Sequence, residues 1–196
     1  IRENIRNIDL TENVLAKKIT ENWNVDIMGT YASTEMQTAF SECTYKCGGH
    51  HHPELIIVEI LNQENKEVES GEIGEIVITN LGVQGTPLVR YRTGDMATKY
   101  TEACACGRNT LRLSPIVGRN QQMIKLKGTT IYPAAIFDIL QSHKEILEFV
   151  VELTTNDFQT DELSIYISTG NMDNEFVKTK ILNHFQSSIR VVPVLQ

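Results

Sequence analysis

Four cysteines and a run of histidines are the residues of this chain best suited to hold a metal. Cys43 and Cys47 precede the histidine run at 50–52, and Cys104 and Cys106 lie in a Cys-Ala-Cys-Gly segment. Thiolate sulfur and imidazole nitrogen are ligands of structural zinc, and glycine lets the backbone fold around the ion. We therefore expect the two clusters to converge on one zinc ion.

Two other interpretations of the cysteines stay open. Disulfides are disfavoured because no secretory signal opens the chain and because Cys-x-Cys spacing is tight for a mutual bond. Four unrelated thiols beside a solvated histidine run form the second alternative.

The segment 29–35, Gly-Thr-Tyr-Ala-Ser-Thr-Glu, has the residue types of a phosphate-binding loop. We expect a short strand at 25–28 to run into it. Backbone N–H groups and the hydroxyls of Ser33 and Thr34 are donors for a phosphate, and the carboxylate of Glu35 suits Mg²⁺. Thr34 as a helix N-cap with Glu35 in the first turn fits the same residues equally well.

Two further segments present charged side chains beside glycine. In Tyr-Arg-Thr-Gly-Asp at 91–95, a strand reaches a glycine turn that displays Asp95, a carboxylate able to accept hydrogen bonds from a ribose diol. A turn-forming Gly-Asp pair is the structural alternative. Arg119 follows Gly118 at a change of sequence style, which indicates either a hinge whose arginine faces a nucleotide or a surface linker.

The elements that must position these residues predict an α+β fold. Before residue 120 we expect a helix near 11–22 with Thr11 as N-cap, and strands at 55–61, 75–79, 88–92 and 111–117. After it we expect a hairpin over 122–132, a helix from Pro133 to about 142, strands at 147–154, 162–168 and 189–194, and a helix to about 187 capped by Asn171 or Asp173. The predicted domains are 1–120 and 121–196.

Composition excludes several classes of protein. The 196 residues are 41% hydrophobic and carry a net charge of −7, which is too apolar for a disordered chain. The acidic balance argues against a general nucleic-acid binder and against a membrane-surface protein. No apolar run is long enough for a membrane span and no signal sequence is present, so we expect a cytoplasmic protein.

Taken in order, the motifs resemble the adenylate-forming ligases, and within them the phenylacetate–coenzyme A ligase branch. The resemblance is carried by the segments at 31–35, 71–79, 87–95, 104–108, 118–119 and 124–133. It implies the end of a large AMP-binding domain followed by a small mobile α+β domain. It also implies that a small carboxylic acid is adenylated with ATP and Mg²⁺ and then transferred to coenzyme A.

The resemblance also implies roles for individual residues. The nucleotide-side residues match as follows: Tyr31 lies against adenine, Ser33 belongs to the cofactor-binding loop, Thr34 contacts the α-phosphate, Glu35 binds Mg²⁺, Asp95 grips the ribose and Arg119 approaches it from the domain junction. Lys127 and Gly128 match the hairpin that lines the coenzyme A thiol tunnel. The zinc ligands of the branch map to Cys43, His50, Cys104 and Cys106, with Cys47 and His52 as competitors for the second position.

Two departures from the family pattern shape the expectation. The hinge position, usually charged, falls in the uncharged segment 120–122. The upstream phosphate loop and the adenylation lysine near the family's C-terminus are missing. We therefore expect an inactive fragment of an aryl-acetate-type ligase, whose exposed inner face allows a homodimer.

Two other functions remain. One is a short, non-catalytic, zinc-stabilised nucleotide-binding or interaction module. The other is an adenylating enzyme that delivers its acyl group to a carrier protein or an amine.

Overall fold

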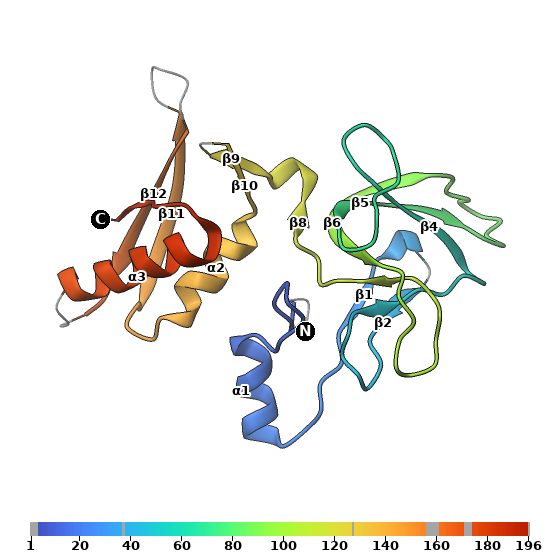
Figure 1. Ribbon diagram of the computed structural model, residues 1–196, viewed down its shortest axis with the longest axis horizontal. Helices are drawn as coiled ribbons and strands as arrows, with labels where there is room; N and C mark the ends of the chain where they lie inside the picture. Colours follow the sequence, from blue (N-terminus) through green and yellow to red (C-terminus); the bar gives the residue numbers. More distant parts are fainter. Residues whose placement is uncertain (1–3, 37, 127, 156–160, 171–173, 196) are drawn as a thin grey trace. The chain divides into compact units, whose positions relative to one another are not determined.

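The computed structural model describes residues 4–36, 38–126, 128–155, 161–170 and 174–195. The chain divides into two compact units, Ile1–Gln121 (unit 1) and Gln122–Gln196 (unit 2). Figure 1 shows the strands and helices of each unit, and the expected α+β class is confirmed. The assignment of these units to particular domains of a ligase remains a prediction.

Unit 1 is built mostly of strands (Figure 1). Its elements are α1 (Val14–Trp23), β1 (Thr30–Ala32), the 3₁₀ turn η1 (Thr34–Met36), β2 (Ala39–Ser41), β3 (Gly49–His50), β4 (Ile56–Leu61), β5 (Ile73–Asn80), β6 (Tyr91–Tyr100), β7 (Arg112–Leu113) and β8 (Gly118–Arg119). The 3₁₀ turn η2 (Asn120–Gln122) contains the last residues of unit 1 and the first residue of unit 2.

The eight strands of unit 1 form one sheet in the order β1-β2-β3-β7-β6-β5-β4, with β8 paired to β6. The pairing of β3 with β7 is antiparallel and joins segments far apart in the chain, with His50 opposite Arg112. A side chain on Gly48 would meet the carbonyl oxygen of Leu113 at 2.6 Å, so the chain entering β3 lies directly against β7. This close approach requires glycine there.

The core of unit 1 is apolar and lies on the sheet. Its fully buried members come from η1, β2, β4, β5, β6 and β7: Met36, Phe40, Ile56, Ile60, Ile76, Ile78, Ala97 and Leu113. Burying a side chain of this size contributes about 1.5–3 kcal/mol of transfer free energy. The core therefore fixes β4, β5 and β6, the strands from which the polar residues project.

Several local expectations for unit 1 are wrong. The strand expected at 88–92 begins only at Tyr91, and the strand expected at 111–117 is reduced to Arg112–Leu113. The strand expected at 25–28 starts later, at Thr30. The helix α1 is capped by the side chain of Asn13, which accepts from the N–H of Ala16, rather than by Thr11. Gly94 is not in a turn: β6 runs through it, with a positive φ of 77° at a register shift opposite Glu75 and Val77. A left-handed residue inside a strand marks a β-bulge, which glycine accepts without strain.

In its described residues, unit 2 contains a hairpin, a three-stranded sheet and two helices. Its elements are β9 (Ile124–Leu126), β10 (Thr129–Ile131), α2 (Pro133–Ser142), β11 (Glu148–Thr155), β12 (Asp161–Ser168), α3 (Asn174–Ile189) and β13 (Val194–Leu195), with the sheet in the order β11-β12-β13. Pro133 begins α2 as expected. The proposed caps of α3, Asn171 and Asp173, lie outside the described residues.

The helices of unit 2 cover one face of its sheet. Along β12, Leu163 and Ile165 are buried, whereas Tyr166, on the opposite face, is 38% exposed. Ile136 and Leu140 of α2 pack with these strand residues and with α3 in one apolar cluster. This alternation of period two defines an inner and an outer face of the sheet. In the part of the chain that the structure describes, no helix of either unit has the length and hydrophobicity to span a membrane.

Candidate functional site

Three of the expected nucleotide-binding residues meet in unit 1. The hydroxyl of Tyr31 donates to Oδ2 of Asp95 at 2.8 Å, and Nε of Arg119 donates to Oδ1 at 3.0 Å. Tyr31, Asp95 and Arg119 are called the Asp95 cluster below. The Asp95 side chain is 14% exposed and that of Arg119 is 64% exposed, so the cluster is open to solvent on the arginine side.

Strand pairing assembles the Asp95 cluster. Asp95 of β6 lies directly opposite Arg119 of β8 in an antiparallel register. Tyr31 comes from β1, and its ring packs on that of Phe40 with centroids 5.9 Å apart. Burial, followed by the neighbouring Asp95 carboxylate, raises the pKa of Tyr31, so its hydroxyl stays protonated and able to donate.

A buried carboxylate holds the bulge that carries Asp95. Glu75, whose side chain is 6% exposed, accepts a hydrogen bond from the N–H of Gly94 at 3.2 Å and from Nε of Arg92 at 3.1 Å. Nδ2 of Asn120 also donates to it, at 3.3 Å. Arg92 and Gly94 precede Asp95 in the chain, and Asn120 follows Arg119. The carboxylate of Glu75 therefore holds together the two segments that carry Asp95 and Arg119. The sequence reasoning did not single out Glu75.

Thr34 and Glu35 of the expected phosphate loop lie in η1, and Ser33 directly precedes it. Thr34 begins this 3₁₀ turn, and Glu35 follows it with an exposed side chain. The pKa of Glu35 lies below its ordinary value chiefly because its own backbone N–H donates to the carboxylate. The Ser33 hydroxyl is buried without a hydrogen-bond partner in the described part of the chain. Nδ2 of Asn80 donates to the Glu35 carbonyl at 2.9 Å and ties η1 to the end of β5. Glu35 is therefore ionised at neutral pH, as a Mg²⁺ ligand must be.

The two expected hairpin residues belong to unit 2. Gly128 adopts a φ of 82° between β9 and β10, where Leu126 pairs with Thr129. Lys127 lies outside the described residues. The structure therefore tests neither residue as part of a coenzyme A tunnel.

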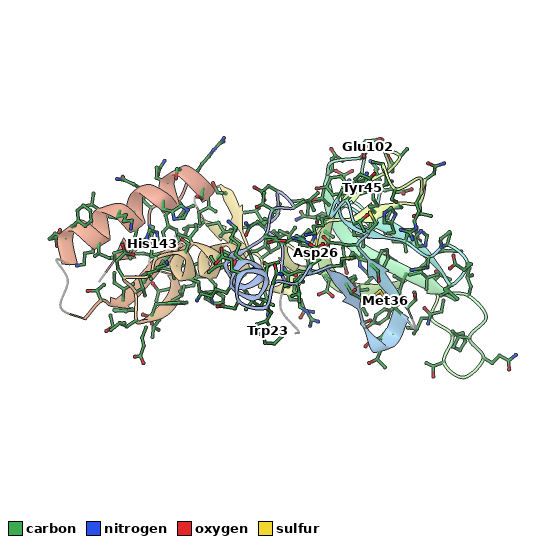
Figure 2. The ribbon with its side chains drawn as sticks, turned by 90° about the horizontal axis from the view of Figure 1, so that it is seen from below. Trp23, Asp26, Met36, Tyr45, Glu102 and His143 are labelled. Atoms are coloured by element: carbon green, nitrogen blue, oxygen red, sulfur yellow. The ribbon has the colours of Figure 1, made fainter. Side chains whose placement is uncertain are left out.

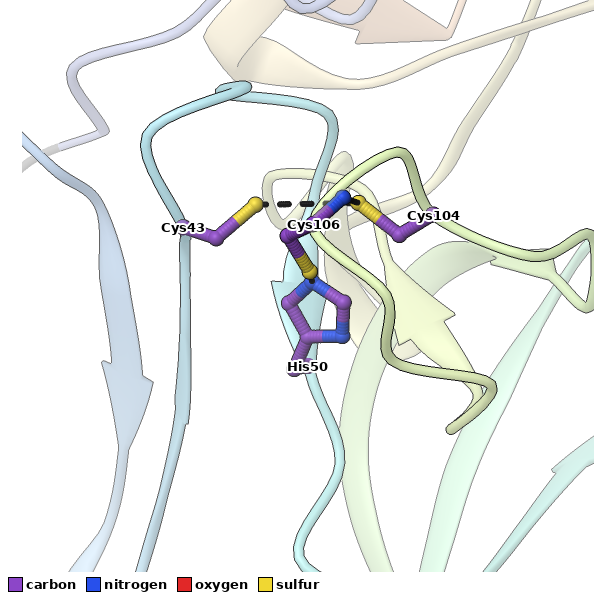
Figure 3. A group of neighbouring side chains, drawn as sticks. All are labelled: Cys43, His50, Cys104 and Cys106. Carbon is purple, nitrogen blue, oxygen red and sulfur yellow. Dashed lines mark hydrogen bonds between the residues drawn. The ribbon is translucent and has the colours of Figure 1, made fainter.

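The second group of polar residues in unit 1 is a Cys/His cluster made of Cys43, His50, Cys104 and Cys106 (Figure 3). The four potential ligand atoms lie within 4.8 Å of one another. The sulfurs of Cys43 and Cys104 are 3.7 Å apart, and Nε2 of His50 is 3.5 Å from the sulfur of Cys106. In a tetrahedral zinc site, ligand bonds of about 2.0–2.3 Å place neighbouring ligand atoms roughly 3.6–3.8 Å apart.

Sheet topology explains why this cluster forms. β2 ends opposite His50, with Ser41 paired to it, so Cys43 lies two residues beyond that point. β7 begins opposite His50, and the connection that precedes it carries Cys104 and Cys106. Figure 2 shows Tyr45 and Glu102, one from each cysteine-bearing connection, at the same end of unit 1.

Contacts around the cluster suit a metal. Nδ1 of His50 lies 3.2 Å from the hydroxyl of Thr110, which leaves Nε2 for the ion. The N–H of Cys106 lies 3.5 Å from the sulfur of Cys104, and this contact chiefly lowers the pKa of Cys104 to about 6. In contrast, burial raises the pKa of Cys43. All four cysteines are free, so the disulfide alternative has no support in the structure.

The competing ligands do not belong to the group of four, although Cys47 lies beside it. The sulfur of Cys47 contacts that of Cys104 at 3.2 Å but is not among the four atoms that surround one point, and burial raises its pKa to about 11. His51 stacks on Phe40 with Nε2 2.8 Å from the carbonyl of Ile56, and His52 pairs with Glu54. The arrangement therefore favours His50 as the histidine ligand.

The chain was compared with protein-family models and with curated proteins. No protein-family model matches it. It is 27% identical over 160 residues to the phenylacetate–coenzyme A ligase of Thermus thermophilus, which covers 80% of this chain and 36% of that protein. It is 29% identical over 133 residues to the same ligase of Pseudomonas putida, covering 67% of this chain and 26% of that protein.

The chain is similar to the phenylacetate–coenzyme A ligases. It spans about a third or less of the length of these curated ligases. The phenylacetate–coenzyme A ligase resemblance seen in the motifs is therefore confirmed for the region that they cover.

Solved structures show that the fold is that of adenylate-forming enzymes. A 2-hydroxyisobutyryl-CoA ligase, in the postadenylation state with 2-HIB-AMP, matches 92% of this chain and 40% of its own with a TM-score of 0.77 and 23% identity. An anthranilate CoA ligase in complex with anthranoyl-AMP matches 91% of this chain and 37% of its own, with a TM-score of 0.60 and 19% identity. The phenylacetate–coenzyme A ligase similarity and this fold agree.

Proposed function

We propose that this chain is the C-terminal part of an AMP-forming ligase that adenylates an aryl-acetate-type acid and transfers the acyl group to coenzyme A. The convergence of Tyr31, Asp95 and Arg119 carries the proposal. Their positions along the chain match the adenine, ribose and domain-junction residues of the family. Tyr31 and Arg119, which are 88 residues apart in the chain, both donate to the carboxylate of Asp95, and this supports one binding site for a nucleotide.

The Asp95 cluster has the capacity to bind a ribose. Each carboxylate oxygen of Asp95 carries one protein donor, so each keeps a further lone pair for a ribose hydroxyl. Arg119 neutralises the carboxylate without blocking it, because its side chain reaches Asp95 from the solvent side. The ring of Tyr31 offers a flat face to the adenine.

Thr34 and Glu35 supply the phosphate end of the proposed site. In the first step the acid carboxylate attacks the α-phosphorus of ATP, and pyrophosphate leaves as the acyl-adenylate forms. Positioning and neutralisation of the developing charge account for most catalysis of this kind. Thr34 would donate to the α-phosphate, and Glu35 would hold Mg²⁺, which supplies positive charge for the departing pyrophosphate.

In the second step the thiol of coenzyme A attacks the acyl carbon of the adenylate and AMP leaves. We assign Lys127 and Gly128, by their match to the family motif, to the passage for that thiol. We propose the aryl-acetate class of substrate because the curated relatives are named phenylacetate–coenzyme A ligases.

The Cys/His cluster has a structural part in this proposal. Zinc held by Cys43, His50, Cys104 and Cys106 would cross-link two connections of unit 1 and leave no open position for substrate. Observed spacings close to those of a tetrahedral site support it.

Two assays test the proposed reaction. A full-length protein that contains this chain should catalyse phenylacetate-dependent ATP–pyrophosphate exchange without coenzyme A, and should form a thioester only when coenzyme A is added. Exchange without a thioester would instead favour a carrier protein or amine as acceptor.

The 196-residue chain by itself should give no detectable thioester from phenylacetate, ATP, Mg²⁺ and coenzyme A. Losing one stabiliser of a charged transition state costs roughly 10²–10³-fold, and this chain lacks the family's upstream phosphate loop. Turnover by the chain alone would contradict this part of the proposal.

A further inference from the structure

Arg112 is a buried cation that the proposed reaction does not use. Its side chain is 9% exposed and lies in β7, between β3 and β6. Nη1 donates to the carbonyl of Cys47, and Nη2 donates to the carbonyl of Glu102 at 3.0 Å. The guanidinium carbon lies 5.7 Å from the centre of the Tyr100 ring. One side chain therefore ties together the backbones of both cysteine-bearing connections.

The backbone of Arg112 occupies the same central place. It pairs with His50 of β3 on one side and with Tyr100 of β6 on the other. A displacement of Arg112 would therefore move a proposed zinc ligand and both connections at once. Surface residues of the same unit, such as Arg90 in its exposed ion pair with Glu59, have no comparable position.

The charge of Arg112 is poorly balanced by the protein alone. Among the described residues, the closest carboxylate oxygen belongs to Glu102 and lies 3.9 Å from Nη2 of Arg112, on a side chain that is 64% exposed. The acceptors that Arg112 uses are neutral carbonyls, and its Nε–H is buried without an acceptor in the described part of the chain. A buried charge is costly unless it is paired.

A zinc ion with three thiolates and one imidazole carries a net charge of −1. Such a complex, formed by the Cys/His cluster, would supply the missing counter-charge beside Arg112. Arg112 is linked to the cluster through Cys47, whose carbonyl accepts from the guanidinium and whose sulfur contacts the sulfur of the proposed ligand Cys104 at 3.2 Å. Arg108, whose Nη1 lies 3.8 Å from the sulfur of Cys106, is a second cation beside the cluster.

We propose that Arg112 is the positioning residue and the counter-charge of the zinc centre: it holds both ligand-bearing connections in register and stabilises the anionic metal complex. This inference rests on the zinc centre proposed above and is independent of the ligase reaction. Partners outside the first coordination sphere commonly change metal affinity by about 10–100-fold.

The test is zinc affinity of the 196-residue chain, measured by competition with a chromophoric chelator. Arg112→Met removes the charge and both donors and should weaken zinc binding about 10–100-fold. Arg112→Lys keeps the charge without the planar fork and should lie between Met and wild type. Arg90→Gln is the matched control and should bind zinc like wild type. Urea unfolding of each variant in EDTA measures its stability without metal.

The outcomes separate two failures. If the wild-type chain binds no zinc, the proposed zinc centre is wrong. If wild type binds zinc and Arg112→Met binds within twofold of it, the role of Arg112 is overturned. If Arg112→Met fails to fold, Arg112→Lys decides the question. A zinc affinity equal to that of wild type would reject the positioning role of Arg112, and a several-fold loss of zinc affinity at unchanged metal-free stability would support it. Cobalt absorption of each loaded variant should still show thiolate coordination, because no ligand is removed.

Discussion

The Asp95 cluster and the Cys/His cluster lie in the same unit but differ in how their charges are balanced. Asp95 has an arginine and a tyrosine hydroxyl on its two oxygens, so it is paired within the protein. In the Cys/His cluster, the sulfurs of Cys43 and Cys104 face each other at 3.7 Å, and Nη1 of Arg108 reaches only the sulfur of Cys106, at 3.8 Å. The side chains of the Asp95 cluster are therefore held in position by one another without a ligand, whereas those of the Cys/His cluster are arranged as the ligands of a metal ion would be.

The largest effect should come from removing a ligand of the Cys/His cluster. Cys104→Ser should abolish stoichiometric zinc, and at a zinc concentration a thousand times Kd this loses about 4 kcal/mol of stability. Zinc content and urea unfolding measure it. Cys47→Ser is the matched control and should keep one equivalent. Retention of zinc by Cys104→Ser would remove the difference between the clusters.

A smaller effect should follow from changing the Asp95 cluster. Asp95→Asn keeps the shape but loses the charge that pairs with Arg119 and that we propose to bind a ribose. Hydrogen bonds to charged groups contribute about 1.5–3 kcal/mol, so AMP binding to the chain should weaken about 10–100-fold. Equilibrium binding of AMP tests this. Equal affinity in Asp95→Asn and wild type would contradict the ribose role.

Tyr31→Phe should be milder still. It keeps the ring and removes only the hydroxyl that donates to Asp95, so we expect a loss of about 0.5–1.5 kcal/mol in unfolding free energy. AMP affinity should change little, because the flat face remains. Tyr45→Phe, at a side chain 58% exposed, is the control and should change stability by less than about 0.5 kcal/mol. A large loss of AMP binding in Tyr31→Phe would assign the hydroxyl a direct contact with the nucleotide.

The smallest effect concerns pH and belongs to unit 2, which has neither cluster. Burial, followed by the nearby His184 and Lys180 charges, lowers the pKa of His143, whose Nε2 lies 3.0 Å from Nδ1 of His184. Below the unfolded pKa of about 6.5 the unfolded chain takes up a proton first, so stability falls as pH drops from there toward the lower folded pKa. Hydrogen exchange in α2 at pH 7.5 and 5.5 measures this change. His143→Gln should lessen it, and an unchanged pH dependence would exclude His143 as the cause.

The residues that form both clusters could be predicted from the sequence, but the residues and strand features that hold them in position could not. Tyr31, Asp95 and Arg119 stand in motifs whose residue types suggest a nucleotide. The bulge at Gly94 depends on Glu75, which is 19 residues away, and local spacing resembles a turn. Because a bulge is defined by two strands together, one strand's sequence does not reveal it.

The same limit applies to the Cys/His cluster. Cys and His spacing predicted convergence, whereas Arg112 and Thr110 gave no signal. Their roles arise from the pairing of β3 with β7, two strands of two residues each, which are too short to show periodicity. The long helices and strands of unit 2, such as β11 and α2, were predicted well because their apolar patterns extend over several turns or alternations.

Because β3 pairs with the distant strand β7, the Cys/His cluster forms only some time after its first cysteine has been synthesised. Cys43 and Cys104 are 61 residues apart, so a ribosome adding about 5–20 residues per second needs roughly 3–12 s to supply the second half of the cluster. In that interval Cys43 and Cys47 have no partner loop, and their thiols face the oxidants of their compartment. Chains made where thiols are kept reduced should therefore acquire zinc more completely than chains made under oxidising conditions.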